Sequence, residues 1–354
     1  MASRSSSLWT YALTRIMLAP LMVWFAVTLV FILVRALPGD PIDAELGPKA
    51  PPELKAELRA SKGYDKPMLV QYLAYLGSFL KFNVTDAEGK WHWLQFNLGD
   101  TSKGEAITKV IGEYFPATVE LALFSLLIAL LIGIPIGAFA ASRSGTKYDA
   151  ASRFFGIITY SIPLFWFGMI LQLIFSVGLN WFPLGTRFPS TMLAPEGPTG
   201  LYTIDSLLKG DGTQFFTSLH YLALPCLSLG VLISGVFERI VRVNLKQTLQ
   251  ADYVEAGRAR GIGERRLLWN HAFRNTLIPV VTILGLTIAA MFGGAILTEV
   301  TFSWPGLAQR LYAAIGQRDY ATVQGIMVFF AVIVTIASLA IDLINACIDP
   351  RIRY

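Results

Sequence analysis

The sequence predicts an all-α membrane protein, a single domain of residues 1–354 built on six transmembrane helices. Hydrophobic residues make up 54% of the chain and charged residues only 15%. The apolar residues gather in nearly uncharged runs, and about 18 to 20 such residues are enough to cross a bilayer as a helix. Two soluble domains, with apolar residues spread along amphipathic elements, are therefore excluded. The six expected spans are residues 16–34, 118–141, 154–177, 222–240, 277–297 and 326–348.

The first span follows Arg4 and Arg15 and so resembles a signal sequence. However, its apolar part is longer than that of a typical signal sequence, and no small-x-small cleavage site follows it. We therefore interpret it as a retained span. The turn Leu37-Pro38-Gly39-Asp40-Pro41 is expected to end the helix, because two prolines and a glycine cannot continue it.

A long polar loop, residues 36–117, is expected to leave the membrane after the first span. It contains helical patterns at residues 52–61 and 68–80 and an amphipathic one at 103–114. Trp91-His92-Trp93 lies between them. We interpret these aromatic residues as interfacial or locally packed rather than as ligand contacts, because tryptophan is enriched at membrane interfaces.

The second and third spans each contain proline, within Gly133-Ile134-Pro135-Ile136-Gly137 and at Pro163. Proline is tolerated in membrane helices because neighbouring helices satisfy the freed backbone groups, and it bends the helix. Each span is therefore predicted to bend. The loop that follows them, residues 178–220, is rich in Pro and Gly and is expected to be irregular.

The last three spans differ in the residues that border them. Glu238 and Arg242 lie four residues apart at the end of the fourth span, which predicts a solvated ion pair at the membrane edge. The fifth span is rich in Gly and Ala, so neighbouring helices can approach it closely. Between the fifth and sixth spans, apolar residues spaced along one face predict a short helix at residues 305–316.

Basic residues in the short loops predict which side of the membrane each loop faces. The loop after the second span has three Lys or Arg, and eight more lie from Arg239 to Arg274. The loops after the third and fifth spans have four in all. The N- and C-termini and the segment 243–275 are therefore expected to be cytoplasmic, and the long loops 36–117 and 178–220 extracytoplasmic.

Signature motifs of several enzyme classes are absent from the sequence. It has no G-x-x-x-x-G-K-[ST] phosphate loop, no H-E-x-x-H zinc motif and no G-x-S-x-G nucleophile elbow. Its three His and two Cys are scattered, which predicts neither a metal site nor a disulfide framework. Glu120, Glu299 and Asp342, near or within spans, are expected to be paired or interfacial rather than proton relays. We therefore expect no catalytic residue and no cofactor in this chain. Its net charge of +5 is attributed to cytoplasmic loops, not to nucleic-acid binding.

The segment 243–275 contains the candidate functional site. Small residues there predict an exposed helix whose backbone another surface can approach closely. Asp252, three residues before Glu255, fits a capping box that would begin this helix. With its glycines exposed and arginines around them, the helix is expected to be a rigid knob that enters a groove on a soluble partner. The candidate docking residues are Glu255, Ala256, Gly257, Arg258, Arg260 and Gly261.

Glu255-Ala256-Gly257, with Gly261 and Leu277-Ile278-Pro279 after it, resembles the EAA loop of ATP-binding-cassette (ABC) importer permeases. Over nearly the whole chain, further motifs resemble the B-type permease subunit of dipeptide, oligopeptide and nickel importers. The departures are an extra stretch at 83–95, a long loop at 178–220, Ala308 and Ala321. The motifs are Leu37-Pro38-Gly39-Asp40-Pro41, Tyr64-Asp65-Lys66-Pro67 with Gln71-Tyr72, Leu98-Gly99-Asp100-Thr101-Ser102, Pro116-Ala117-Thr118-Val119-Glu120-Leu121, Glu299 with Phe302-Ser303-Trp304-Pro305-Gly306-Leu307, Arg318-Asp319-Tyr320 and Asp349-Pro350-Arg351-Ile352.

The resemblance implies a type I importer subunit in the cell (inner) membrane of a bacterium or archaeon. It implies a homologous C-type permease, two cytoplasmic subunits that bind ATP and Mg, and an extracytoplasmic substrate-binding protein as partners, with membrane lipid around them. The docking residues would then couple ATPase closure to the spans, and replacing Glu255 and Gly261 is expected to abolish transport without preventing insertion. The candidates for contact with the binding protein, or for an outer gate, are Phe302, Trp304, Pro305, Gly306 and Asp319.

Two alternatives remain open from the sequence. The same machinery could import another small solute, such as a nickel chelate, an opine or a sugar, because cargo choice rests largely with the binding protein. A six-span membrane enzyme or scaffold would instead act without an ATPase partner. The missing catalytic motifs weigh against that second reading.

Overall fold

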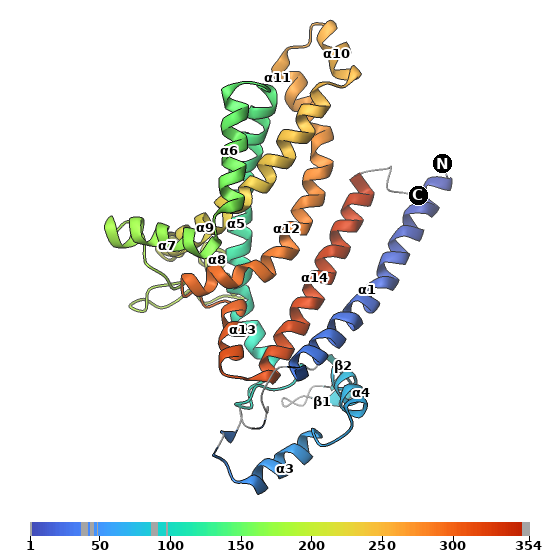
Figure 1. Ribbon diagram of the computed structural model, residues 1–354, viewed down its shortest axis with the longest axis vertical. Helices are drawn as coiled ribbons and strands as arrows, with labels where there is room; N and C mark the ends of the chain where they lie inside the picture. The colour runs from blue at the N-terminus through green and yellow to red at the C-terminus, as the bar shows by residue number, and fades with distance from the viewer. Residues whose placement is uncertain are drawn as a thin grey trace. The chain divides into compact units, whose positions relative to one another are not determined.

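The computed structural model describes residues 2–36, 42, 46–47, 49–85, 91–96 and 98–348, and it is mostly helical, as predicted. Two β-strands are the exception to the all-α prediction. The labels follow Figure 1. The main helices are α1 (Ala2–Ala36), α3 (Pro52–Lys62), α4 (Met68–Ser78), α5 (Ile107–Ser142), α6 (Lys147–Ser161), α7 (Leu164–Leu171), α8 (Tyr202–Lys209), α9 (Gly212–Leu249), α10 (Asp252–Ala259), α12 (Phe273–Thr301), α13 (Leu307–Gly316) and α14 (Tyr320–Ile348).

The described residues form two compact units. The first consists of the described parts of Met1–Leu18, Pro116–Ala308 and Ile336–Tyr354. The second consists of the described parts of Ala19–Phe115 and Gln309–Thr335. The first unit holds the segment 243–275, which is called the coupling segment from here on. Two sequence motifs, residues 37–41 and 349–352, lie outside the described residues.

Five described helices are long and apolar enough to cross a membrane, and a bent pair makes six if it is counted as one span. The pair is α6 and the helix Leu164–Gly178, which consists of α7 and a π-helix, η1 (Gln172–Gly178), and the two axes differ by 100° (Figure 1). The span expected at 154–177 is therefore not one bent helix but two helices with a break between them. Pro163 explains the break, because it cannot donate a backbone hydrogen bond and favours an extended residue before it. Ile162 is extended, with ψ of 126°.

Helices α5 and α9 approach each other closely at two glycines of α5. A Cβ atom at Gly133 would lie 2.4 Å from the carbonyl oxygen of Ser234, and one at Gly137 would lie 2.5 Å from that of Glu238. Real Cβ atoms do not come this near a backbone oxygen. The small residues therefore permit a backbone-to-backbone contact, which drives helix association in lipid through van der Waals packing.

Replacing Gly133 by alanine is expected to destabilise the protein by about 1–3 kcal/mol, because the new methyl group forces the two backbones apart. Gly112, an exposed glycine of the same helix, has no neighbouring atom within 4 Å of such a Cβ. Gly112→Ala should instead stabilise the helix by up to about 1 kcal/mol. Thermal unfolding of the detergent-solubilised protein measures both, and equal midpoints would contradict the close-contact argument.

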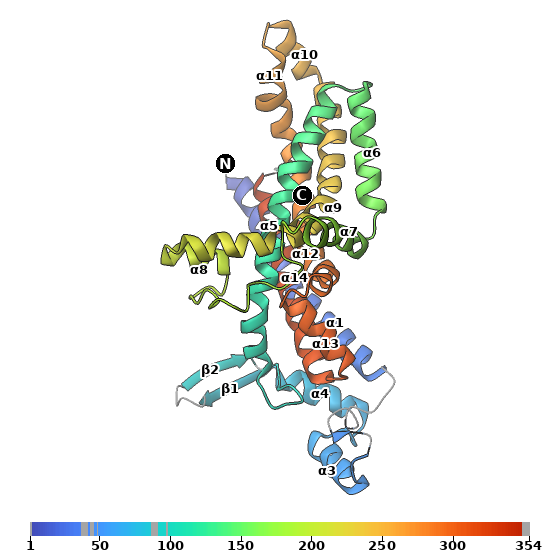
Figure 2. The ribbon, with the colours of Figure 1, turned by 90° about the vertical axis from the view of Figure 1, so that its left-hand side faces the viewer.

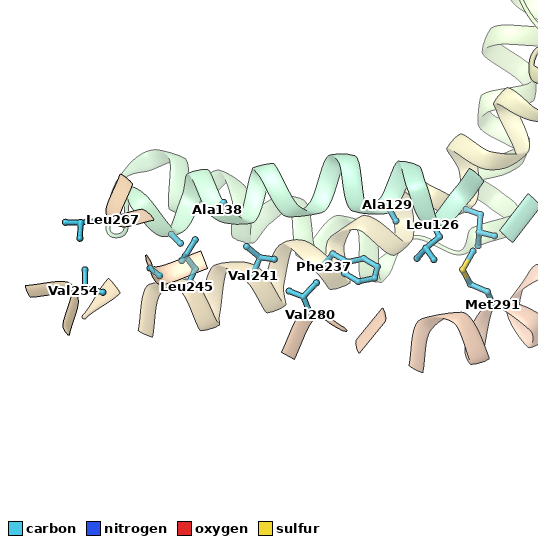
Figure 3. Close-up of a cluster of buried hydrophobic side chains, with 13 residues drawn as sticks. Leu126, Ala129, Ala138, Phe237, Val241, Leu245, Val254, Leu267, Val280 and Met291 are labelled. Atoms are coloured by element: carbon cyan, nitrogen blue, oxygen red, sulfur yellow. The ribbon is translucent and has the colours of Figure 1, made fainter. Parts of the chain in front are cut away.

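A buried hydrophobic cluster extends along the first unit from the middle of α5 and α9 to the candidate coupling segment (Figure 3). Leu126 and Met291 lie at one end of it. Val254 of α10 and Leu267 lie at the other, beyond Leu245. Both Val254 and Leu267 are fully buried. The coupling segment is thus continuous with the core of the unit rather than a loose loop.

In the second unit, the helices expected at 52–61 and 68–80 are confirmed as α3 and α4, whereas residues 107–114 begin α5 instead of forming a separate helix. Helix α4 is tied to α1 by hydrogen bonds from the Arg35 Nε to Gln71 (3.0 Å) and between the hydroxyls of Thr28 and Tyr72 (2.5 Å). The remaining feature, an antiparallel pair β1 (Leu80–Thr85) and β2 (Trp91–Phe96), was not predicted (Figure 2).

Candidate coupling and gate sites

Helix α10 ends in a Schellman motif that depends on Gly261. The Ile262 N–H donates to the Gly257 carbonyl (3.1 Å), and the Gly261 N–H donates to the Arg258 carbonyl (3.0 Å). Gly261 has φ of +79°. This left-handed conformation costs a non-glycine residue about 1–2 kcal/mol. The glycine therefore reverses the chain after α10 so that it returns toward the membrane helices.

The other glycine of the motif, Gly257, is buried rather than exposed, which corrects the sequence prediction. Its Cβ position would lie 2.7 Å from Cδ2 of Leu267. The physical reason is that Val254 and Gly257 lie three residues apart on one face of α10, and this face packs on the core. The expected capping box is also wrong, because Ala251 is the N-cap residue and no side chain caps the helix.

The opposite face of α10 is exposed and carries most of the predicted docking residues. Glu255, Ala256, Arg258 and Arg260 are all exposed. Arg258 donates two hydrogen bonds to Glu264, of 2.5 and 3.2 Å. The pairing with Glu264 raises the pKa of the Arg258 guanidinium above its ordinary value. The structure thus presents one buried and one exposed face, as a helix must if it is to transmit force from a partner.

Helix α12 connects this segment to the far end of the unit without a break. It follows a short π-helix, η2 (Leu267–Ala272), and runs for 29 residues from Phe273 to Thr301. At about 1.5 Å per residue this is about 43 Å, enough to cross a bilayer. One continuous helix therefore leads from the coupling segment to the residues after Thr301.

Those residues are the predicted gate candidates, and the structure places them in a buried cluster. Phe302 and Trp304 are each 1% exposed. The Trp304 indole N–H donates to the Ala117 carbonyl (2.9 Å), and the Phe302 carbonyl accepts from the Thr186 N–H (2.8 Å). Gly306 is buried and Pro305 is half-buried. In this conformation the cluster is packed inside the unit instead of forming an open docking surface.

A buried carboxylate supports the same cluster. Thr118 donates its hydroxyl hydrogen to Oε1 of Glu299 (2.6 Å) and accepts from the Leu307 N–H (2.9 Å). Glu299 is fully buried, and a Cβ at Gly306 would lie 2.2 Å from its carboxyl carbon. Thr118 therefore joins the end of α12, the start of α13 and helix α5. The expectation that Glu299 is paired is confirmed.

Asp319, the last gate candidate, belongs to the second unit and caps α14. Its carboxylate accepts from the N–H and hydroxyl of Thr322 (3.1 and 2.6 Å) and from the Ser102 N–H (3.3 Å). Burial alone would raise the pKa of Asp319, but the hydrogen bonds from Thr322 and Ser102 outweigh it and lower the pKa below the ordinary value of 3.8. The cap is therefore charged at neutral pH.

Asp319→Ala is expected to lower stability by about 0.5–2 kcal/mol, the usual effect of losing an N-cap. Because the folded-state pKa is depressed, this contribution is present above about pH 4 and is lost as pH falls through the folded pKa. The difference in thermal midpoint between wild type and Asp319→Ala should therefore shrink in acid. The exposed neighbour variant Gln317→Ala is the control, and a pH-independent difference would contradict the argument.

Sequence reasoning missed the partner of Glu120. This buried carboxylate accepts from Nε and Nη2 of Arg187 (3.0 and 2.6 Å) and from the N–H and hydroxyl of Thr203 (2.8 and 2.7 Å). The Arg187 guanidinium also lies 3.6 Å from the ring centre of Tyr202. Pairing of Glu120 was predicted, but Arg187 lies in the irregular loop, and no local pattern connects the two.

Glu238 and Arg242 do form the predicted ion pair, but the prediction that this pair is solvated is wrong. Glu238 is fully buried and accepts from Arg242 Nε (2.8 Å) and from the Ser152 hydroxyl. Arg242 also approaches Asp149 of α6 (3.7 Å). The i,i+4 spacing was correct, but α6 covers this face of α9, so the pair joins two helices instead of facing water.

A polar cavity of about 650 Å³ lies beside the gate cluster. Gln172 spans part of its wall, donating to the carbonyls of Leu184 (2.6 Å) and Thr301 (3.1 Å). Thr186, Ser190 and Ser303 are among the other lining residues. Hydroxyl, amide and backbone groups of this kind can hydrogen-bond a polar solute. Among the described residues, no group of His, Cys, Asp or Glu is arranged to hold a metal ion.

Two family models match the chain. The model described as "Binding-protein-dependent transport system inner membrane component" matches residues 133–354, and the model for the N-terminal part of such components matches residues 8–122. A solved chain of the MetNI methionine ABC transporter, in an inward-facing form, is similar over 66% of this chain and 93% of its own. Its identity is 16% and its TM-score 0.48.

Several relatives are similar over nearly their whole length. The di/tripeptide permease protein DppB of Pseudomonas aeruginosa is 36% identical over 94% of this chain and 95% of its own. The dipeptide permease protein DppB of Escherichia coli is 34% identical, covering 92% and 93%. The oligopeptide permease protein AppB of Bacillus subtilis is 33% identical, again covering 92% and 93%. This multi-pass membrane protein therefore belongs to the family of inner membrane components of binding-protein-dependent transport systems, the permeases of ABC importers.

Proposed function

We propose that this chain is the transmembrane permease subunit of an ATP-driven importer that moves dipeptides or oligopeptides from an extracytoplasmic binding protein into the cytoplasm. The named relatives, permeases for dipeptides, tripeptides and oligopeptides, support the cargo. The chain itself has no phosphate loop, so ATP and Mg would be bound by partner subunits.

One observation carries the proposal: the exposed helix α10 is anchored in the core and is joined through α12 to the buried gate cluster. Force applied to the exposed face around Glu255 reaches Val254 and Leu267 without an intervening flexible loop. The same helix, α12, ends at Thr301, next to Phe302. Closure of an ATPase pair on α10 would thus bias two states of the gate, as alternating access requires.

The proposed partners are those that the resemblance to ABC importer permeases implies. The exposed face of α10 would enter a groove on one of two cytoplasmic ATP-binding subunits. A homologous C-type permease would complete the substrate path. The polar cavity beside Thr301 and Ser303 is open to hydrogen-bond a peptide backbone and would form part of the outer path on this subunit.

The test is to co-express the chain with the neighbouring permease and ATPase subunits, reconstitute the complex in lipid and measure ATP hydrolysis. Binding protein loaded from a peptide library should stimulate hydrolysis and drive peptide uptake into vesicles, and mass spectrometry identifies the bound peptides. Stimulation by a nickel chelate, an opine or a sugar instead would overturn the peptide cargo. An assembled complex indifferent to every loaded binding protein would overturn the importer assignment.

A further inference from the structure

Two adjoining cavities open beside the coupling segment, and they differ in chemistry. The first, of about 680 Å³, lies among α5, α6 and η2, and the second, of about 580 Å³, lies at the ends of α5 and α9 and against α11 (Glu264–Arg266). Ser142 and Leu268 line both. The two cavities therefore adjoin at these two residues, and they are referred to together as the groove.

The first cavity is apolar and aromatic. Phe139, Phe155 and Trp269 line it, together with Ala151. Phe139 and Trp269 remain 45% and 43% exposed, so part of each ring stays open to a ligand. An elongated hydrocarbon chain is the kind of ligand that such a wall accommodates, because it offers apolar area and almost no hydrogen-bonding groups.

The second cavity is basic. Lys246, Arg258 and Arg265 line it, with Glu264 as the acidic member. Glu264 is engaged by Arg258, which leaves Lys246 and Arg265 without an ion-pair partner among the described residues. The excess of positive charge matches a monoanionic phosphate group.

Basic residues against two aromatic residues of the first cavity, a group called the rim, strengthen the same match. The Arg143 guanidinium lies 4.3 Å from the ring centre of Phe139 and 5.1 Å from that of Tyr148, with Lys147 5.5 Å from Tyr148. This rim falls where the apolar run of α5 ends at Ser142. Aromatic and basic residues placed together at the end of a membrane span are typical of the headgroup level of a bilayer.

We propose that this groove binds an anionic phospholipid, with an acyl chain in the cavity of Phe139, Phe155 and Trp269 and the phosphate against Lys246 and Arg265. The order of the two ends, apolar within the span and basic beyond it, is the order of tail and headgroup in a membrane leaflet. The lipid would contact Leu268 and Arg265, which follow α10 within the coupling segment. Its occupancy would therefore influence the position of α10.

The test uses the assembled transporter in phosphatidylcholine nanodiscs that contain a phosphatidylglycerol with a photoreactive acyl chain. Crosslinks are expected in the peptides that contain Phe155 and Trp269, and unlabelled phosphatidylglycerol should compete better than phosphatidylcholine. Lys246→Ala with Arg265→Ala should raise the half-saturating concentration of phosphatidylglycerol roughly 25-fold, at about fivefold for each basic side chain. The control pair Arg239→Ala with Arg266→Ala removes the same charge at exposed positions that line neither cavity.

A second variant tests the apolar end separately. Ala151→Trp fills the first cavity and should abolish the crosslinks, whereas Ala150→Trp, at an exposed neighbouring position outside the groove, should leave them unchanged. Equal labelling of Ala151→Trp and wild type would overturn the proposal. So would equal competition by phosphatidylcholine, or a crosslink between Ala151→Cys and another subunit. If Ala151→Trp fails to assemble, the Lys246 and Arg265 variants decide the question.

Discussion

A transporter carrying Gly261→Val should assemble in the membrane and yet lose about 90% or more of binding-protein-stimulated ATP hydrolysis and uptake. The reason is local. Valine is β-branched and resists the φ of +79° at this position. The Schellman motif therefore opens, or the strain of about 1–3 kcal/mol is relieved by tilting α10. A cost of about 1.4 kcal/mol already changes an equilibrium tenfold, which is enough to depopulate the coupled conformation.

Gly263→Val is the matched control for this prediction. Both glycines are exposed, and neither has an atom within 4 Å of a Cβ position. They differ in backbone conformation, because Gly263 has φ of −63°, which any residue adopts. Normal uptake by Gly261→Val, or an equal loss in both variants, would contradict the role assigned to the turn. Membrane insertion and complex assembly are checked by size-exclusion chromatography.

Replacing Glu255 on the exposed face of α10 tests the contact with a partner subunit rather than the backbone geometry of the turn at Gly261. Glu255→Ala removes an exposed charge and leaves the buried face with Val254 unchanged. Loss of coupling in this variant, measured as binding-protein-stimulated ATP hydrolysis, would therefore arise at the partner surface. Comparison with Gly261→Val separates a lost contact from a displaced helix.

The spans could be predicted from the sequence because each is a long apolar run, and the presence of such a run does not depend on tertiary contacts. The limits of α9 were less predictable. The predicted span ended at residue 240, whereas α9 continues to Leu249 through polar residues such as Asn244 and Lys246. Hydropathy identifies the part of a helix that lies in the membrane, so it does not detect polar turns beyond it. The break at Ile162 was predicted only as a bend, since proline permits either outcome and the packing of the neighbouring helices decides which occurs.

The partners of buried charges could not be predicted, because they come from distant segments. Glu238 and Arg242 gave a correct local spacing, but only the packed α6 places Ser152 and Asp149 against them. Gly257 was expected to be exposed for a similar reason. Its neighbour Leu267 lies in the next helical segment, and sequence spacing along α10 gives no sign of that contact.

The largest loss of stability is expected for Arg187→Met, about 3–5 kcal/mol, because an uncompensated buried charge is costly. This change leaves the buried carboxylate of Glu120 without its positive partner. Methionine is close to arginine in length and retains apolar contact with Tyr202, so lost packing contributes little. Thermal unfolding of the solubilised protein measures the loss.

The double variant Arg187→Met with Glu120→Gln tests whether the lost stability comes from the unpaired charge of Glu120 or from the other contacts of Arg187. Glutamine keeps an oxygen that accepts from the N–H and hydroxyl of Thr203, while it removes the charge that Arg187 neutralised. Removing both members of a buried pair is often nearly neutral, so the double variant should recover at least half of the stability lost in Arg187→Met. A double variant as unstable as Arg187→Met would mean that the hydrogen bond from Arg187 to the Gly200 carbonyl (2.7 Å), and not the ion pair, holds the irregular loop in place.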